Sequence, residues 1–309
     1  MALKLVGPDF FDLSALLSEE EIAIQNMTND WVKNRFYPLI SKHYREGTFP
    51  FELQKEMGGM GFFGSTLPEK YDTAGINSVA YGLMMQELER GDSGLRSFAS
   101  VQGSLVMWPI WKYGSEVQKQ KWLPLLASGE KIGCFGLTEP DYGSNPGGMI
   151  TRVKHEGDNF ILNGTKMWIT NSPVADVALI WAKDEGGEVR GFLVERGTPG
   201  FETPEIKGKL SLRASVTGEI VLSNCEIPLE NQLPEADGLK APLSCLTQAR
   251  YGINWGVMGS AIACYEEAVD YAKTRIQFDK PIAAFQLTQQ KLAEMLNEIT
   301  KAQFLTLQL

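Results

Sequence analysis

The sequence is poor in the residues that hold metal ions or form disulfides. Its 309 residues include four cysteines and two histidines. The cysteines lie far apart, without a Cys-x-x-Cys pair, at Cys134, Cys225, Cys245 and Cys264. Structural zinc sites need closely spaced Cys and His ligands, so we expect no metal site. We interpret the four cysteines as reduced, buried thiols of an intracellular protein.

Long apolar runs and an excess of positive charge are also missing. No segment approaches the roughly 20 apolar residues that a membrane-spanning helix needs. The 29 Lys and Arg are outnumbered by 38 Asp and Glu, a formal net charge of −9, which argues against binding duplex nucleic acid. The first residues, MALKLVGPDF, resemble neither a signal peptide nor a transit peptide. We therefore expect a cytoplasmic protein, or one of the mitochondrial matrix if the source is eukaryotic.

Common cofactor and nucleophile motifs are missing as well. No Gly-x-Gly-x-x-Gly fingerprint follows a predicted strand, and the chain has neither a Gly-x-x-x-x-Gly-Lys-[Ser/Thr] loop nor a Gly-x-Ser-x-Gly elbow. What is present is an ordinary globular composition, with 43% hydrophobic and 22% charged residues. The length suits one large domain or two ordinary ones.

The first part of the chain, from about residue 18 to residue 132, has the pattern of a helical domain. Ser18, followed by three glutamates, predicts a capped helix start, because acidic residues favour the first turn. Asp92 or Ser93 can cap a later helix. Further helices are predicted over residues 51–58, 78–90, 93–111 and 115–126.

From about residue 133 to residue 242 the apolar period shifts towards two. Short strands are predicted at 177–181, 189–194, 201–206 and 218–227, with turns at 156–159 and 162–165. This density predicts a β-barrel or sandwich and not a parallel sheet. Helices return over 246–273 and 286–307. The predicted fold is α+β, with an N-terminal helical domain at 1–132, a middle β-barrel domain at 133–242 and the start of a C-terminal helical bundle at 243–309.

Two segments of the β region carry groups suited to a polar or aromatic ligand. The loop from Phe135 to Pro146 is rich in Gly, Ser and Thr, which offer backbone N–H groups and hydroxyls. Trp168 and Thr170 alternate in a strand pattern, so an indole and a hydroxyl would share one face. Taken alone, an ordinary strand-ending turn and a core tryptophan explain these segments better.

Taken with the rest of the chain, these segments resemble the acyl-CoA dehydrogenase family. The segments GCFGLTEPDYGSNP, KMWITNS, KGKLSLRASVTGEIVLSNCEIP and RIQFDKPIAAFQ match the family pattern in the same order. The resemblance runs from about residue 18 to the last residue. The segments ELERGDSGLRS, SLVMWPIWKYGSE and ARYGINWGVMG are most similar to its glutaryl-CoA dehydrogenase branch. The resemblance implies a homotetramer in which one chain completes another's cofactor site.

The resemblance also implies an FAD site. Trp168 would pack over the flavin, Thr170 would lie near the flavin N5, and Arg275 would contact phosphate across a subunit interface. The other cofactor residues that it implies are Phe135, Leu137, Thr138, Gly143, Ser144, Ile169, Phe278 and Gln286. The residues that it implies at the acyl-CoA substrate are Glu89, Arg96, Ser97, Ser100, Ser144, Leu243 and Arg250.

Arg96 bears on the choice of substrate. It falls in the first turn of a predicted helix, where a solvated surface charge is one interpretation. In the glutaryl-CoA dehydrogenases the matching Arg binds the distal carboxylate of the substrate, and Glu89 would orient it here. A substrate without that carboxylate would leave a buried Arg96 unpaired. The resemblance thus implies oxidation of a short-chain acyl-CoA, with decarboxylation of glutaryl-CoA to crotonyl-CoA, and an electron-transfer flavoprotein as partner.

The sequence departs from the family pattern in three places. Asn145 replaces the Asp of a Gly-Ser-Asp motif after a bulky Tyr142, and Asp279 replaces a Gly beside the expected pyrophosphate. The tyrosine–glutamate–glycine–threonine segment with the family's catalytic base does not occur before Leu309. We therefore expect the rest of the helical bundle to lie outside this chain, and assign no catalytic base. Two alternatives stay open: a dehydrogenase of another short-chain acyl-CoA, with Arg96 in a structural pair, or a non-catalytic binding protein on the same scaffold.

Overall fold

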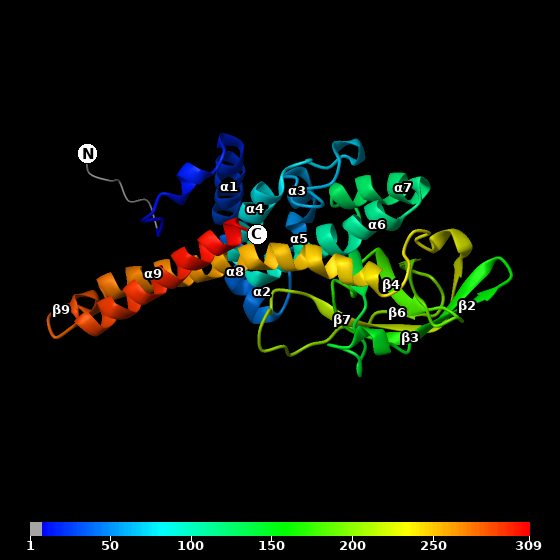
Figure 1. Ribbon diagram of the computed structural model, residues 1–309. Coiled ribbons are helices and arrows are strands. Elements are labelled where there is room, and N and C mark those ends of the chain that lie inside the picture. Colours follow the sequence, from blue (N-terminus) through cyan, green and yellow to red (C-terminus); the bar gives the residue numbers. More distant parts are fainter. Residues whose placement is uncertain (1–7) are drawn as a thin grey trace. The chain divides into compact units, whose positions relative to one another are not determined.

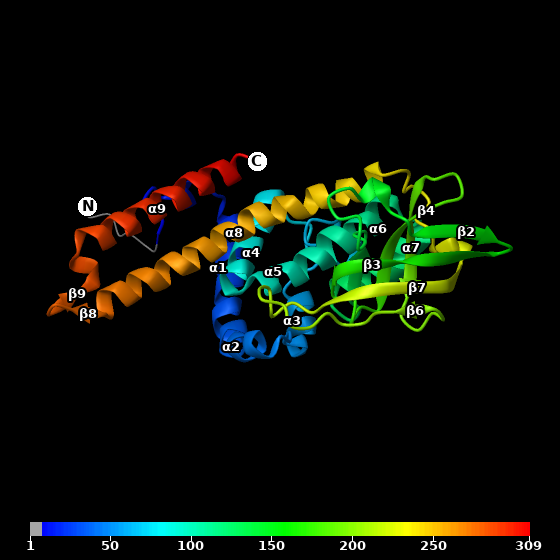
Figure 2. The same ribbon diagram turned by 90° about the horizontal axis from the view of Figure 1, so that it is seen from below.

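The computed structural model describes residues 8–309, which Figures 1 and 2 show from two sides. The chain divides into two units. The first comprises Met1–Pro38, Asn77–Arg96 and Tyr251–Leu309, and the second comprises Leu39–Ile76 and Ser97–Arg250. Helices make up most of the first unit, and the second joins helices to a β-sheet, so the predicted α+β class is confirmed. The bounds of the three domains predicted from the sequence stay a prediction.

Two packed helices, α1 (Glu19–Trp31) and α4 (Ser78–Gly91), organise the first unit. As predicted, α1 begins at a capping box. The Ser18 hydroxyl accepts a hydrogen bond from the Glu21 N–H, and the Glu21 carboxylate accepts one from the Ser18 N–H. Most residues of α4 are buried, including charged ones. Carboxylates buried in this helix need partners, which makes α4 a place to look for function.

A hairpin joins the last two long helices, α8 (Lys240–Thr274) and α9 (Gln286–Leu307), which run in opposite directions (Figure 2). Its strands are β8 (Ile276–Gln277) and β9 (Lys280–Pro281). In its later part α8 comes very close to α4, since a Cβ at Gly259 would overlap the α4 backbone. Only residues without a side chain allow such an approach.

The remaining helices are shorter. No helix within residues 8–309 is long and apolar enough to cross a membrane. The helix predicted over 93–111 is in fact three pieces, because a π-helical segment (Val101–Met107) separates α5 (Ser93–Ser100) from α6 (Trp108–Tyr113). The others are α2 (Tyr37–Glu46), α3 (Gln54–Gly59) and α7 (Glu116–Ala127), with short 3-10 or π turns at Leu13–Leu16, Val32–Phe36, Phe51–Leu53, Glu69–Tyr71, Pro146–Gly148, Leu229–Asn231 and Ile282–Ala284.

A curled, mostly antiparallel sheet forms the β part of the second unit. Its order is β1-β4-β2-β3-β7-β6, and β5 pairs with β4. β1 and β4 are parallel, as is a single β2–β4 pairing, and the other pairs of the sheet are antiparallel, so it is not the parallel sheet that the sequence argued against. The strands are β1 (Gly133–Gly136), β2 (Arg152–Glu156), β3 (Asn159–Thr170), β4 (Val177–Lys183), β5 (Val189–Glu195), β6 (Phe201–Glu202) and β7 (Thr217–Pro228).

Two local predictions in the β region were wrong. The turn predicted at 162–165 is absent, because β3 continues through it with a register shift at Gly164. Gly164 has a φ of 150°, and a Cβ there would lie 2.7 Å from the Cα of Thr151, so the glycine serves a bulge and a close backbone approach. The strand predicted at 201–206 is limited to β6, followed by a single bridge from Glu205 to Gly218.

Buried apolar side chains of the sheet form the core of the second unit. Burial raises the pKa of Cys134 to about 12, so its thiol stays protonated and unreactive at neutral pH. Cys225 and Cys245 are buried too, but Cys264 is exposed, which corrects the prediction of four buried thiols. The core cluster comprises Cys134, Val153, Leu162, Ile169, Ala175, Ala178, Ile180, Ala182, Phe192, Val194, Ile220, Leu222, Cys225 and Ile227.

A fully buried ion pair joins the loop after β1 to strand β3. The Lys166 ammonium lies 2.9 Å from Oε1 of Glu139, and the two side chains are 0% and 1% exposed. Lys166 also donates a hydrogen bond to the Leu137 carbonyl. Glu139 accepts further bonds from the N–H groups of Ile150 and Thr151 and from the Thr151 hydroxyl. The pair therefore connects three chain segments at one point.

Burial acts on the pKa of both partners. Burial lowers the pKa of Lys166 to about 8, against the opposing attraction of Glu139. Burial raises the pKa of Glu139, but the Lys166 ammonium and the hydrogen bonds from Ile150 and Thr151 outweigh it, so the pKa lies below its usual value of 4.5. At neutral pH Glu139 is thus a carboxylate with full hydrogen bonding.

The β8–β9 hairpin has a strained two-residue turn. Phe278 and Asp279 have φ angles of 51° and 60°, in the left-handed region that glycine and asparagine favour in such turns. A bulky aromatic residue rarely adopts this conformation. The family pattern has Gly where Asp279 stands, and the backbone conformation gives a physical reason for that preference.

We expect the Glu139→Gln variant to lose both stability and acid sensitivity. Breaking a buried ion pair costs about 3–5 kcal/mol. Because the folded-state pKa of Glu139 is lowered, its contribution is present above about pH 4.5 and is lost as the pH falls through the folded-state pKa. Urea titrations between pH 3 and pH 7 should show a flatter stability profile for this variant. An unchanged profile would contradict the assignment, and Glu185→Gln, an exposed carboxyl group, is the control.

The left-handed backbone of the turn predicts that a glycine at position 279 raises the free energy of unfolding. Asp279→Gly should stabilise the chain by about 1 kcal/mol, since a left-handed conformation costs a non-glycine residue roughly that much. Asp279→Asn removes the charge but keeps a side chain that tolerates the left-handed region, so it should have little effect. The midpoint of urea unfolding measures both variants. Equal gains from both would show that charge, not backbone conformation, matters at this turn.

Candidate functional site

A pocket of about 300 Å³ opens in the second unit, at the lower end of the volumes typical of ligand sites. The loop after β1, the end of β3, the start of α8 and the π-helical segment form its walls. Figure 1 shows these strands in green and the start of α8 in yellow. The lining residues are Val101, Leu105, Phe135, Leu137, Thr138, Gly143, Ser144, Pro146, Trp168, Ile169, Thr170, Leu243, Leu246 and Arg250.

Trp168 presents an aromatic surface at this pocket. Its side chain is 56% exposed, whereas the next residue, Ile169, is buried in the core. The strand alternation breaks here, because the β3–β7 register shifts between Lys166 and Ile169 and Trp168 has a φ of 62°. Such a bulge re-aims a side chain. The interpretation of Trp168 as an ordinary core residue is therefore wrong.

The polar groups of the pocket come from the loop after β1, from the end of β3 and from α8. Thr138, Ser144 and Thr170 supply hydroxyls, and Gly143 has open space where a side chain would be. Arg250 is the only charged residue among these lining residues. A pocket with an apolar floor, hydroxyls and one cation suits a flat, partly polar ligand with negative charge.

Hydrogen bonds fix the walls of the pocket. The Met167 N–H donates to the Thr138 carbonyl at 2.8 Å, which ties the loop after β1 to the end of β3. The Lys166–Glu139 pair lies directly beside this bond in sequence and reinforces the same connection. The start of α8 is held by a 2.7 Å hydrogen bond between the hydroxyls of Ser244 and Tyr113.

A second buried ion pair lies in the first unit. Nε of Arg96 donates to Oε2 of Glu89 at 2.6 Å, and the two side chains are 11% and 4% exposed. The Ser93 hydroxyl donates to the other Glu89 oxygen at 2.9 Å. Within residues 8–309, Glu89 is the one acceptor that the Arg96 guanidinium meets, so both of its Nη groups remain for a ligand.

This pair corrects two expectations about Arg96. The side chain is not a solvated surface charge, because it is buried. A substrate without a distal carboxylate would also not leave it unpaired, since Glu89 already neutralises it. Ser97 and Ser100 follow Arg96 on α5, and Ser100 is buried. Their contact with substrate stays a prediction.

The residues implied at the cofactor from a neighbouring subunit lie around the β8–β9 hairpin. Arg275 immediately precedes β8, Phe278 is in the turn, and Gln286 begins α9. All three side chains are exposed, and Phe278 is 87% exposed. Their contact with a cofactor across a subunit interface stays a prediction.

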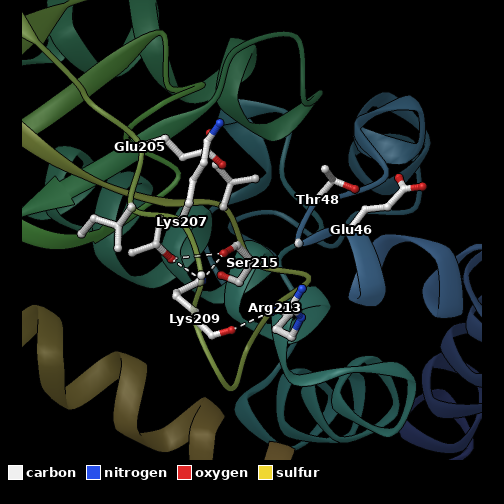
Figure 3. Close-up of a pocket in the computed structure, with 12 residues that line it drawn as sticks. Glu46, Thr48, Glu205, Lys207, Lys209, Arg213 and Ser215 are labelled. Carbon is white, nitrogen blue, oxygen red and sulfur yellow. Dashed lines mark hydrogen bonds and ion pairs between the residues drawn. The ribbon is translucent and has the colours of Figure 1, made fainter.

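A further pocket, of about 220 Å³, lies in the second unit and is shown in Figure 3. Its inner cations are already engaged. Lys209 donates to acceptors of its own loop, at Leu212, Ser215 and Thr217. Arg213 donates to the backbone oxygens of Tyr44, Arg45 and Lys209. These bonds hold the loop after β6 in place and leave few donors for an anion, so we assign this pocket no ligand.

The structure brings together most of the predicted cofactor residues in one pocket. They are Phe135, Leu137, Thr138, Gly143, Ser144, Trp168, Ile169 and Thr170, with Leu243 and Arg250 from the predicted substrate set. Sequence reasoning missed Lys166 and Glu139, although both stand within the quoted motifs. A lone charge in an apolar strand pattern was the available signal, because such a charge needs a buried partner.

The donor set of the pocket fits a flavin. An exposed indole offers a face for a flat ring, and Thr138 and Thr170 line the same pocket with hydroxyls that can hydrogen-bond to a polar ring edge. No carboxylate lines the pocket to repel an anionic cofactor. Residues 8–309 contain no group of three or more His, Cys, Asp or Glu side chains that could hold a metal ion.

Family models match three successive stretches of the chain. They are described as the N-terminal domain of acyl-CoA dehydrogenase, over residues 18–130, its middle domain, over residues 134–225, and its C-terminal domain, over residues 236–309. Together they extend across both units. The three-part fold expected from the sequence is therefore confirmed.

Individual relatives support the same assignment. A glutaryl-CoA dehydrogenase from Mycobacterium smegmatis, solved in complex with FADH2, is 51% identical with a TM-score of 0.97, over 99% of this chain and 79% of that chain. The butyryl-CoA dehydrogenase structure from Megasphaera elsdenii is 33% identical with a TM-score of 0.90, over 94% of this chain and 79% of that one. The mitochondrial short-chain specific acyl-CoA dehydrogenase of Homo sapiens is 35% identical over 95% of this chain and 72% of its own length. The chain belongs to the acyl-CoA dehydrogenase family, whose members bind FAD.

Proposed function

We propose that the protein oxidises glutaryl-CoA and that decarboxylation of the product gives crotonyl-CoA. The buried Arg96 guanidinium carries this proposal. Its Nε is bound to Glu89, and its two Nη groups have no acceptor within residues 8–309. Two parallel N–H groups match a carboxylate, which is the group that distinguishes a glutaryl chain from a fatty acyl chain. The 51% identity to a glutaryl-CoA dehydrogenase supports the same substrate.

The residues of the pocket have separate tasks in this proposal. FAD, when bound, supplies the acceptor for the hydride that leaves the β-carbon of the thioester. Trp168 packs on the flat ring, and Thr138 and Thr170 donate or accept hydrogen bonds at its polar edge. Ser144, Leu243 and Arg250 bind the CoA thioester, with Arg250 as the cation. A base that removes the α-proton is also required, and we assign that role to no residue of this chain.

A second candidate is the oxidation of an unbranched short-chain acyl-CoA. The Glu89–Arg96 pair supports it, because Arg96 is already neutralised without a substrate carboxylate. The 35% identity to a short-chain specific enzyme supports it as well. In this case the ion pair is structural, and its free Nη groups bind water.

Two partners follow from the resemblance. We propose a homotetramer, as the resemblance implies. We also propose electron-transfer flavoprotein as the acceptor of the electrons. The cytoplasm, or the mitochondrial matrix in a eukaryote, remains the expected compartment.

Flavin bleaching under anaerobic conditions separates the two substrates. The natural full-length protein, loaded with FAD, should be bleached by glutaryl-CoA at lower concentrations than by butyryl-CoA. Arg96→Lys keeps a charge for Glu89 but cannot present the planar fork of two parallel N–H groups that a guanidinium offers to a carboxylate. It should raise the glutaryl-CoA concentration needed by about tenfold and leave butyryl-CoA unchanged. Equal or better bleaching of the unmodified protein by butyryl-CoA would favour the second candidate.

A further inference from the structure

The ion pair of Glu89 and Arg96 lies against helix α8 at Gly256. A Cβ built at Gly256 would overlap Oε2 of Glu89, the oxygen that accepts from Arg96. The same Cβ would lie 3.1 Å from the Glu89 carboxyl carbon and 3.3 Å from Nε of Arg96. The carboxylate therefore occupies the space that any side chain at position 256 would need.

Glu89 is held from two sides in this space. The Ser93 hydroxyl binds Oε1 and Arg96 binds Oε2, so the direction of the carboxylate is fixed. Arg96 is long and flexible, but Nε lies 2.6 Å from this fixed oxygen, which orients the planar guanidinium. The position of the free Nη groups thus depends on how closely Glu89 can approach α8.

Neighbouring glycines on α8 show that this arrangement is particular to Gly256. One turn earlier, a Cβ at Gly252 would lie 2.8 Å from the Tyr81 hydroxyl, which is also the end of a side chain. At Gly259 a Cβ would overlap the backbone oxygen of Gln86, which cannot move alone. Of these three, Gly256 alone touches the ion pair. An alanine there can be accommodated by moving the Glu89 carboxylate, without moving the helix.

We propose that Gly256 is a positioning residue that determines the preference for thioesters with a distal carboxylate. It leaves room for Glu89, and Glu89 in turn orients Arg96 toward that carboxylate. The inference rests on the proposed function of Arg96. Gly256 itself contacts neither the cofactor nor the reacting atoms in this account.

The test measures binding, so it does not depend on turnover. Isothermal titration calorimetry of the full-length protein, with its FAD reduced by dithionite under anaerobic conditions so that neither thioester can be oxidised, gives dissociation constants for glutaryl-CoA and butyryl-CoA. Gly256→Ala should weaken glutaryl-CoA binding about tenfold and leave butyryl-CoA within about twofold. Gly252→Ala, the matched control on the same helix, should change neither. Both substitutions raise helix propensity, so the folded state should persist, as the melting temperature will show.

A shorter carboxylate provides a rescue. Glu89→Asp removes one methylene and gives back the space that the methyl group introduced by Gly256→Ala would occupy. The Gly256→Ala, Glu89→Asp double variant should therefore bind glutaryl-CoA more tightly than Gly256→Ala alone, whereas Glu89→Asp by itself should not bind it more tightly than the unmodified protein. This non-additivity is a signature that a general loss of stability does not produce.

The outcomes separate the inference from the proposed function. If Gly256→Ala binds glutaryl-CoA as tightly as the unmodified protein, or weakens both ligands equally, the role of Gly256 is refuted while the function of Arg96 stands. If the unmodified protein itself binds butyryl-CoA as tightly as glutaryl-CoA, the proposed function fails and the inference fails with it.

Discussion

The buried attraction between Lys166 and Glu139 is the constraint on which the candidate cofactor site depends. Two charges without solvent contact are tolerated only when each is paired and hydrogen-bonded, and both conditions are met here. Because the pair joins the loop after β1, the segment at Thr151 and strand β3, it fixes the two walls that carry Thr138 and Trp168. A site for a rigid, flat cofactor needs walls held in this way.

The Glu89–Arg96 pair is also a buried ion pair, but it differs in the donors that it leaves unbound. Lys166 donates to two acceptors, the Glu139 carboxylate and the Leu137 carbonyl, whereas Arg96 has one acceptor on Nε and two free Nη groups within residues 8–309. The first pair lies inside the protein, and the second is neutral but has both Nη groups left for an anion. This difference explains why one pair stabilises the pocket and the other is suited to recognise an anion. Because Gly256 has no side chain, helix α8 leaves room for the Glu89 carboxylate of the second pair.

The sequence predicted the class, the order of the helical and β regions, and most of the cofactor pocket. Helix starts such as Ser18 follow from local capping chemistry, so they could be read directly. The sequence alone could not predict that β3 continues through Gly164 or that Trp168 turns outward, because bulges depend on the partner strand β7. The pair of Lys166 and Glu139 was missed for a similar reason, because these residues are 27 positions apart and meet only in the folded chain. The contact of Gly256 with Glu89 is more distant still in sequence.

The central claim is that Arg96 recognises the distal carboxylate of the substrate. Glutaramyl-CoA has the length and shape of glutaryl-CoA, but an uncharged amide replaces that carboxylate. Comparing the dissociation constants of the two compounds for the protein with its FAD already reduced, so that neither compound can be oxidised, therefore isolates the one charge in question. The account predicts that glutaryl-CoA binds at least about tenfold more tightly, as expected for hydrogen bonds between charged groups. Equal affinity for the two compounds would contradict it.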